Sequence, residues 1–138
     1  MYRGSCLCGA IQVEITGEIS EIIHCHCSLC RKNSGTAYAT NGFVDADKFL
    51  VVKGADAMSH FSFKPRRFRH FCTACGSPIY SENQDDPSRV RVRLGLLDSD
   101  IAEKPGAHIF VGSKGNWEDM DAVLPRYDEF EPSRQKQK

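Results

Sequence analysis

The stretches Gly4-Ser-Cys-Leu-Cys-Gly9 and Phe71-Cys-Thr-Ala-Cys-Gly76 decide how this chain is expected to fold. In each, a pair of cysteines is followed directly by glycine, which readily takes the positive φ that turns backbone N–H groups toward a bound sulfur. Four thiolates are a ligand set of closed structural zinc sites. We therefore predict that one zinc ion ties the N-terminus to the middle of the chain, held by Cys6, Cys8, Cys72 and Cys75.

This predicted zinc site closes a long loop. Closing such a loop costs the chain a few kcal/mol of entropy, roughly as the logarithm of its length. A structural zinc site contributes on the order of 10 kcal/mol, which exceeds that cost. We expect the metal-free protein to be largely unfolded. Buried thiols or a disulfide are the alternative for these four cysteines.

The remaining three cysteines form the spacing Cys25-x-Cys27-x2-Cys30, and Arg31 rather than glycine follows them. Catalytic zinc sites use three protein ligands and leave a fourth position open. Seven cysteines divide naturally into four and three, so we predict two zinc ions per chain, the second held by Cys25, Cys27 and Cys30. Two alternatives remain: a second closed site completed by His24 or His26, and a redox pair of Cys27 with Cys30.

Three thiolates give the predicted open centre a net charge of −1, so it polarises a bound water less than a centre of neutral imidazoles does. Hydrolysis is therefore disfavoured. Such a centre is suited to binding a fourth, incoming thiol, because a coordinating thiol is deprotonated. The nucleophile would then be the substrate's own sulfur.

The chain has the size of one domain. It has 138 residues, 41% of them hydrophobic, which is enough for a single core. We expect one zinc-binding domain over residues 1–130 and a disordered tail over residues 131–138, which lacks apolar side chains after Phe130. The N-terminus has no apolar signal region and no run of about 18 apolar residues exists, so we expect a cytoplasmic protein without a membrane segment.

The charges are balanced, with 18 Lys plus Arg against 18 Asp plus Glu, and this balance argues against a general nucleic-acid binder. One basic cluster interleaved with phenylalanines lies in residues 61–71 and contains Lys64, Arg66, Arg67 and Arg69. Alternating strand faces explain this cluster more simply than nucleic-acid contact.

Short alternating segments predict a mainly β protein. Residues 10–16 alternate apolar and polar side chains, and residues 89–94 place Val90 and Val92 toward a core. We expect Arg89, Arg91 and Arg93 on the opposite face, in water. Further strands are expected at residues 37–40, 49–52, 58–63, 67–71, 79–81 and 108–111, and short helical turns at residues 46–49, 97–101 and 117–121.

Three segments together resemble the glutathione-dependent formaldehyde-activating enzymes, a family similar to a centromere-associated protein. They are Gly4-Ser-Cys-Leu-Cys-Gly9, His24-Cys-His-Cys-Ser-Leu-Cys-Arg-Lys-Asn-Ser-Gly35 and Phe71-Cys-Thr-Ala-Cys-Gly-Ser-Pro-Ile79. A later part, from His108-Ile109 through Trp117 to Leu124-Pro-Arg-Tyr127, is also similar. The resemblance implies an Mss4-like fold of small curled antiparallel sheets around a structural zinc, and the same division of the seven cysteines into a structural and an active-site group.

The resemblance also implies an activity: a carbon–sulfur lyase that joins glutathione and formaldehyde into S-hydroxymethylglutathione. No motif marks the residues that contact glutathione. Arg31 and Lys32 adjoin the open site and are candidates for pairing with substrate carboxylates, although a solvated basic turn is an equal alternative. Tyr38, Phe43 and Trp117 are candidates for a pocket wall, with core packing as the simpler role.

Two other functions compete with this one. The first is a non-catalytic zinc-stabilised module that holds a protein or nucleic-acid partner, which predicts two saturated metal sites. The second is a methionine sulfoxide reductase on a similar scaffold. It would need a reactive cysteine besides the zinc ligands, and all seven cysteines are already assigned.

Overall fold

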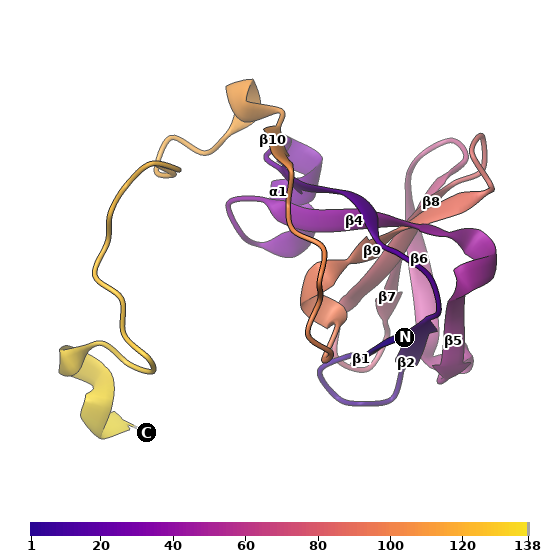
Figure 1. Cartoon of the computed structure of the whole chain (residues 1–138), viewed down its shortest axis with the longest axis horizontal. Coiled ribbons are helices and arrows are strands. Elements are labelled where there is room, and N and C mark those ends of the chain that lie inside the picture. Colours follow the sequence, from indigo (N-terminus) through magenta and orange to yellow (C-terminus); the bar gives the residue numbers. More distant parts are fainter. Residues whose placement is uncertain (138) are drawn as a thin grey trace.

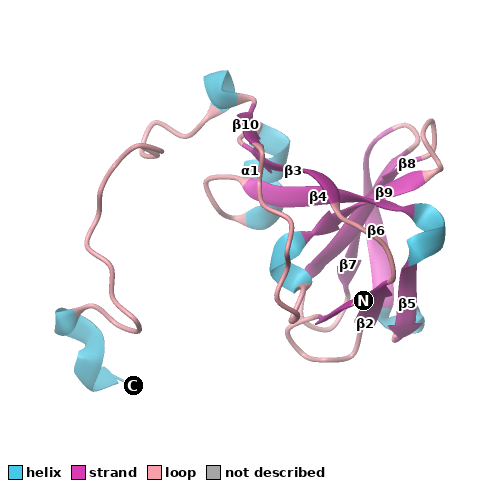
Figure 2. Cartoon of the chain, viewed as in Figure 1, coloured by secondary structure: helices cyan, strands magenta, loops and turns pink. Residues whose placement is uncertain are grey.

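The computed structural model describes residues 1–137 and shows a mainly β protein, as expected from the alternating segments (Figures 1 and 2). Within these residues the one α-helix is α1 (Ser28–Ser34). The strands are β1 (Tyr2–Ser5), β2 (Gln12–Ile15), β3 (Ser20–Cys25), β4 (Ala39–Asp45), β5 (Phe49–Lys53), β6 (Met58–Lys64), β7 (Arg67–Cys72), β8 (Pro78–Asn83), β9 (Arg89–Arg93) and β10 (Ala107–Ile109). Short 3-10 helices are η1 (Ala46–Lys48), η2 (Ala55–Ala57), η3 (Leu94–Leu96), η4 (Val111–Ser113) and η5 (Pro132–Gln137).

The strands form two sheets. A three-stranded sheet has the order β1-β2-β5, and a seven-stranded sheet has the order β10-β3-β4-β9-β8-β7-β6. All pairs are antiparallel except β10, which runs parallel to β3 and pairs Ile109 with Cys25. The expected fold of curled antiparallel sheets is thus confirmed, with one parallel strand added at an edge.

The core lies between the sheets in two main apolar clusters. One contains Ile11, Val13 and Ile79 together with the sulfur-bearing Cys6 and Cys72. The other is formed by Ile15, Ile19, Ile22, Val44, Val90 and Val92. The buried residues 11, 13 and 15 alternate with polar neighbours, as a strand with one face on the core requires.

The expectation that the arginines of β9 face water is wrong. Arg93 is only 8% exposed, and Arg91 lines a cavity. The strand does alternate, with Val90 and Val92 on the core side. On its other face, Arg91 and Arg93 line a cavity instead of extending into open solvent. Of the short helical turns, the one at residues 46–49 appears as η1, whereas those expected at residues 97–101 and 117–121 are wrong, since neither range contains a helix and η3 ends at Leu96.

The chain leaves the sheets after η4. In Figure 1 residues beyond about 114 run away from the body toward the C-terminus, and the large side chains of Trp117, Val123 and Leu124 are exposed. Residues 132–137 form the 3-10 helix η5, and residue 138 lies outside the described residues, so disorder of residues 131–138 stays a prediction. Nowhere in residues 1–137 is there a helix of the length and hydropathy that crossing a membrane requires.

Candidate metal centres and the adjoining cavity

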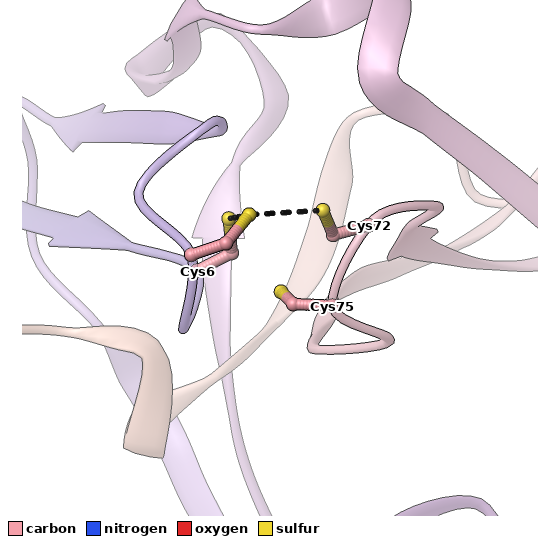
Figure 3. A group of neighbouring side chains, drawn as sticks. Cys6, Cys72 and Cys75 are labelled. Atoms are coloured by element: carbon pink, nitrogen blue, oxygen red, sulfur yellow. Dashed lines mark hydrogen bonds between the residues drawn. The ribbon is translucent and has the colours of Figure 1, made fainter.

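Two hairpin-like turns bring Cys6, Cys8, Cys72 and Cys75 together across 64 residues of sequence. Cys6 follows β1, and Cys72 ends β7. Their four Sγ atoms lie within 4.8 Å of one another, and Figure 3 shows Cys6 facing Cys72 and Cys75. The Sγ atoms of Cys6 and Cys8 are 3.6 Å apart, and those of Cys8 and Cys72 are 3.8 Å apart.

Each turn contains the glycine that the sequence pattern required. Gly9 has φ 79° and Gly76 has φ 78°, a region that other residues enter only with strain. The N–H of Gly9 donates to Cys6 O and that of Gly76 donates to Cys72 O, at 2.9 and 2.8 Å. The glycines therefore close two tight turns, one from Cys6 to Gly9 and one, a residue longer, from Cys72 to Gly76.

These four sulfurs fit a tetrahedral zinc ion. A Zn–S bond of about 2.3 Å places the sulfurs of a tetrahedron about 3.8 Å apart, which matches the separations of 3.6 Å between Cys6 and Cys8 and 3.8 Å between Cys8 and Cys72. A disulfide would require about 2.05 Å, and all seven cysteines are free. Hydrogen bonding from Ser77 lowers the pKa of Cys75 to about 5, which favours the thiolate that a metal ligand needs.

The second group comprises Cys25, Cys27 and Cys30, whose Sγ atoms also lie within 4.8 Å of one another. Cys25 ends β3, and Cys27 caps α1 by accepting a hydrogen bond from the Cys30 N–H at 3.3 Å. The helix thus turns Cys30 back toward the strand. Burial raises the pKa of Cys25 to about 12, so this thiol requires a cation nearby to ionise at neutral pH.

His24 and His26 point away from this sulfur group, as strand alternation predicts. His24 Nδ1 shares a hydrogen bond with Thr40 Oγ1, and the fully buried His26 shares one through Nε2 with His108 Nδ1, each at 2.8 Å. Both histidines pack against Tyr38. Neither belongs to the sulfur group, so the alternative of a second site closed by a histidine finds no support in this geometry.

A cavity of about 580 Å³ adjoins Cys25, Cys27 and Cys30. It lies on one face of the seven-stranded sheet, because Phe43, Arg91, Ser81 and Arg69 are successive cross-strand partners and all line it. Its other lining residues are Glu21, Ile23, Asn41, Gly42, Phe63, Arg67, Arg93, Ile109 and Phe110. Another cavity, of about 590 Å³, contains Cys6 and Tyr38 but none of the three cysteines, so we assign the chemistry to the first.

Four arginines make this cavity basic. Arg69 donates to Leu29 O at 3.2 Å, and its Nη2 lies 3.8 Å from Cys30 Sγ. Arg93 donates to Asn33 Oδ1 at 2.7 Å and to Asn41 Oδ1. Burial, followed by repulsion from neighbouring arginines, lowers the pKa of both Arg91 and Arg93, yet guanidinium groups remain charged in proteins.

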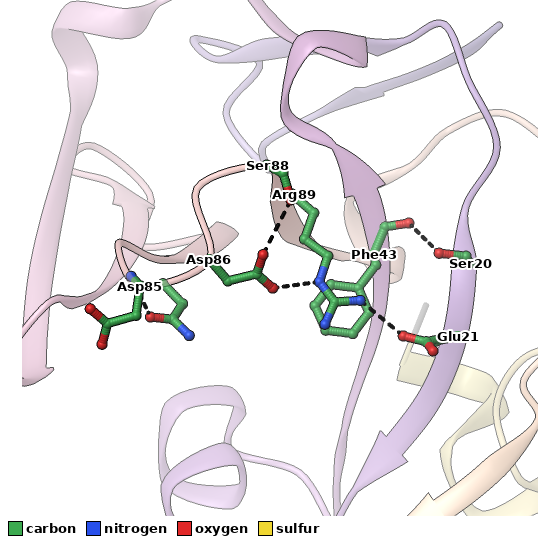
Figure 4. Close-up of polar contacts among 8 residues, drawn as sticks. Ser20, Glu21, Phe43, Asp85, Asp86, Ser88 and Arg89 are labelled. Carbon is green, nitrogen blue, oxygen red and sulfur yellow. Dashed lines mark hydrogen bonds and ion pairs between the residues drawn. The ribbon is translucent and has the colours of Figure 1, made fainter.

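A fifth arginine, Arg89, packs against Phe43, which lines the cavity (Figure 4). The Arg89 guanidinium lies 3.6 Å from the centre of the Phe43 ring. It also binds Asp86 and Glu21, at 2.6 and 3.1 Å. Glu21, the carboxylate that lines the cavity, is therefore already paired with Arg89.

Among the residues proposed from sequence, Phe43 lines the cavity. Arg31 and Lys32 lie on α1 but are not among its lining residues, Tyr38 packs on the histidines, and Trp117 is 66% exposed. Four cavity residues were not predicted as site residues from the sequence: Arg67, Arg69, Arg91 and Arg93. The sequence did contain a pattern that could have indicated them, since both β7 and β9 carry arginines at every second position.

The chain is similar to known proteins over most of its length. The model of the family described as glutathione-dependent formaldehyde-activating enzyme matches residues 1–113. A protein of Halomonas elongata, provisionally named a glutathione-dependent formaldehyde-activating enzyme, is 31% identical over 130 residues, covering 88% of this chain and 82% of the relative. A solved Rhodobacter sphaeroides protein, a structural genomics target, superposes with a TM-score of 0.63 over 77% of this chain and 98% of that one. At 21% identity this last likeness shows the fold alone.

Proposed function

This chain belongs to the family of glutathione-dependent formaldehyde-activating enzymes, and from that premise we propose that it joins glutathione and formaldehyde into S-hydroxymethylglutathione. In this reaction the sulfur forms a bond to the aldehyde carbon while the C=O π bond breaks. The thiol proton ends on the new hydroxyl oxygen. The reverse direction cleaves a carbon–sulfur bond, which is the chemistry of a carbon–sulfur lyase.

One observation carries this proposal: three of the seven cysteines converge beside a cavity, while the other four form a separate group in which Cys6 and Cys72 belong to the core and Cys8 is exposed. We propose that each group holds a zinc ion. A zinc ion bound to Cys25, Cys27 and Cys30 would supply a site at which a ligand thiol is held deprotonated. The group of four has the full ligand set of a structural site and therefore stabilises the fold.

The side chains around the three cysteines stabilise the thiolate form of their sulfurs. The guanidinium of Arg69 lies 3.8 Å from Cys30 Sγ and is held there by stacking on Phe63, 4.5 Å from the ring centre. A fixed positive charge stabilises thiolates in a partly buried site more than mobile solvent does. Arg69 is therefore expected to favour the thiolate form of both the cysteines and the incoming substrate.

Apolar side chains form part of the wall of the same cavity. Phe43, Phe63 and Ile109 line it, and Ile109 is fixed beside Cys25 by the pairing of β10 with β3. Apolar side chains next to the sulfur group lower the local dielectric, which strengthens the interaction between Arg69 and a thiolate. We place the reaction in the cytoplasm, where thiols remain reduced.

The test is adduct formation between glutathione and ¹³C-formaldehyde, followed by NMR exchange at equilibrium. The zinc-loaded protein is expected to accelerate exchange well above the protein-free rate, and Cys27→Ser is expected to abolish the acceleration while one zinc per chain remains. Arg66→Gln serves as the control, since Arg66 pairs with Asp85 and does not line the cavity. Exchange at the protein-free rate with two zinc ions bound would overturn the proposal in favour of a non-catalytic binding module.

A further inference from the structure

The three-cysteine group takes its sulfurs from two elements of the fold. Cys25 ends β3, whereas Cys30 lies on α1 and Cys27 caps that helix. Their Sγ atoms lie within 4.8 Å of one another, and this convergence depends on where α1 sits against the sheet. The contacts that fix α1 therefore also fix the geometry of the group.

Helix α1 is too short to be stable by itself. It has seven residues, and isolated helices of fewer than about 12 residues are marginal in water. Cys30 is its one buried residue, so the helix has no apolar face that anchors it to the core. Its position must therefore depend on polar contacts with the sheet.

Two arginines of the seven-stranded sheet supply such contacts. Arg69 on β7 donates a hydrogen bond to Leu29 O at 3.2 Å. Arg93 on β9 donates from Nη2 to Asn33 Oδ1 at 2.7 Å. Within residues 1–137, no further side chain of this sheet forms a hydrogen bond with α1 except for the approach of Arg69 to Cys30 Sγ. The two arginines thus hold the helix near its first and its last turn.

Arg93 forms a bridge between the sheet and the helix. It pairs with Asn41 of β4 in the sheet, and its Nη1 donates to Asn41 Oδ1 while its Nη2 donates to Asn33. Arg93 and Asn41 are 8% and 5% exposed, whereas Asn33 is exposed. The planar guanidinium has donors in a fixed geometry, so a rigid point in the sheet sets the position of α1.

The charge of Arg93 is suited to the same place. Both of its hydrogen-bond partners are neutral amides, and buried charges in proteins are usually paired. Burial, followed by repulsion from Arg69, lowers the pKa of Arg93, whereas negative charge on Cys30 and Cys25 opposes that shift. The thiolates of the three-cysteine group are therefore the anions that this buried guanidinium faces.

We propose that Arg93, acting through Asn33, is a positioning residue for the second metal centre, which holds α1 where Cys30 can bind the same ion as Cys25. The inference rests on the proposed function, because it assigns how the zinc site of that function keeps its shape. Contacts that orient metal ligands without touching the metal typically change metal affinity 10- to 100-fold.

The test measures how tightly the second zinc ion is held and how it is coordinated. A chelator is titrated into the protein with two zinc ions, and the vacated centre of the one-zinc protein is then filled with Co²⁺, whose visible bands report tetrahedral sulfur coordination. Asn33→Ala is expected to release the second zinc ion at an about 10-fold or more lower chelator concentration and to weaken the Co²⁺ bands.

Two further variants separate positioning from folding and from charge. Asn33 is exposed and alanine is the stronger helix former, so Asn33→Ala does not weaken the helix itself. Asn33→Asp keeps an acceptor for Arg93 and is expected to hold the second zinc ion at least as tightly as the wild type. Arg93→Lys keeps the charge but not the fork that bridges two amides, and is expected to resemble Asn33→Ala.

The contact itself is isolated by a double variant. Because Arg93→Lys and Asn33→Ala remove the same bridge, the two together are expected to weaken the second site no more than either does alone. Arg66→Gln is the control, because Arg66 pairs with Asp85 on the surface, and it is expected to change the zinc affinity less than 2-fold.

The outcomes separate this inference from the proposed function. If Asn33→Ala, or Arg93→Lys, holds the second zinc ion as tightly as the wild type with unchanged Co²⁺ bands, the inference is overturned even where adduct formation is catalysed. Equal losses in Asn33→Asp and Asn33→Ala would also overturn it.

The reverse result is equally distinct. If the variants lose the second zinc ion as predicted while formaldehyde exchange in the wild type stays at the protein-free rate, the proposed function fails and the role of Arg93 stands. A wild-type chain that holds a single zinc ion would overturn the inference, and formaldehyde exchange would then decide the proposed function by itself.

Discussion

Gly76 adopts φ 78° directly after Cys75, and space does not limit this position, since a Cβ added there would meet no atom within 4 Å. Backbone conformation alone therefore requires glycine. We predict that Gly76→Ala lowers the free energy of unfolding of the zinc-loaded protein by about 1–2 kcal/mol, measured by urea denaturation.

Gly95 is the matched control for this prediction. It also has open space around its Cα, but its φ is not positive, so Gly95→Ala should change the stability by less than about 0.5 kcal/mol. Equal losses in the two variants would contradict the role given to the glycine turn beside the sulfur group.

Asp86 accepts a hydrogen bond from Arg89, and this bond lowers the pKa of the Asp86 carboxyl (Figure 4). A carboxyl whose pKa is lower in the folded state stabilises that state above its unfolded pKa of about 3.9. The contribution is lost as the pH falls through the folded value. We predict that Asp86→Asn is less stable than the wild type at pH 7 and that the two converge on acidification below about pH 4.

Thermal unfolding at a series of pH values checks this prediction. Asp56→Asn is the control, because Asp56 is exposed and its carboxylate forms no ion pair within residues 1–137. A stability difference between Asp86→Asn and the wild type that is independent of pH would show that the Arg89 contact does not act through charge.

At the scale of elements, β10 is joined to the segment that follows β3 partly through a histidine pair, in which His26 is buried and His108 is exposed. His26 is 0% exposed and shares a 2.8 Å hydrogen bond with His108 of β10. Since His26 Nδ1 already lacks a partner, removing His108 would leave a buried ring with none. We predict that His108→Ala costs about 1–3 kcal/mol of unfolding free energy and increases amide exchange at β10.

His60→Ala provides the comparison, because His60 lies exposed on the edge strand β6. It should change the unfolding free energy by no more than about 0.5 kcal/mol. If both variants lose the same stability, the His26–His108 contact contributes nothing specific to the attachment of β10.

Most of the strands were predictable because apolar side chains alternate with polar ones, as at Val13 and Val92, but β1 and β3 were not expected. Alternation does not reveal whether the second face of a strand meets open solvent or lines a cavity. For this reason Arg91 and Arg93 were expected in solvent. Helix α1 was also not foreseen, since its seven residues are too few for an apolar stripe and it is fixed by the Cys27 cap and by tertiary contacts.

The candidate metal groups were predictable to a greater extent. Cysteine spacing and the following glycines divided seven cysteines into groups of four and three, and the structure brings together the same two groups. Contacts that depend on distant strands, such as Arg69 with Cys30, leave no local pattern in the sequence. For this reason Arg31 and Lys32, which follow the cysteines in sequence, were named as candidates for contact with the substrate.

For the whole molecule, the two sulfur groups should have unequal effects on folding. Cys6 and Cys72 are part of the core cluster between the sheets, so we expect loss of a zinc ion bound there to separate the two sheets. The other group lies at the edge formed by β3 and α1. We predict that Cys72→Ser is largely unfolded by circular dichroism, whereas Cys27→Ser stays folded with about one zinc ion per chain.

Chelation of the wild-type protein should follow the same order, with the three-ligand zinc removed first and unfolding coupled to loss of the second. Metal analysis alongside circular dichroism during a chelator titration measures both events. Unfolding that accompanies loss of the first zinc ion would contradict the division into a structural and a functional centre.

The central claim is that Cys25, Cys27 and Cys30 hold a zinc ion with a position free for the substrate thiol. Zinc X-ray absorption fine structure of the protein with two zinc ions measures this directly as the mean number of sulfur ligands per zinc. The claim predicts about 3.5, the mean of four and three, rising to about 4 when glutathione is added. A mean of 4 before glutathione, or a value that stays at 3.5 in saturating glutathione, would contradict it.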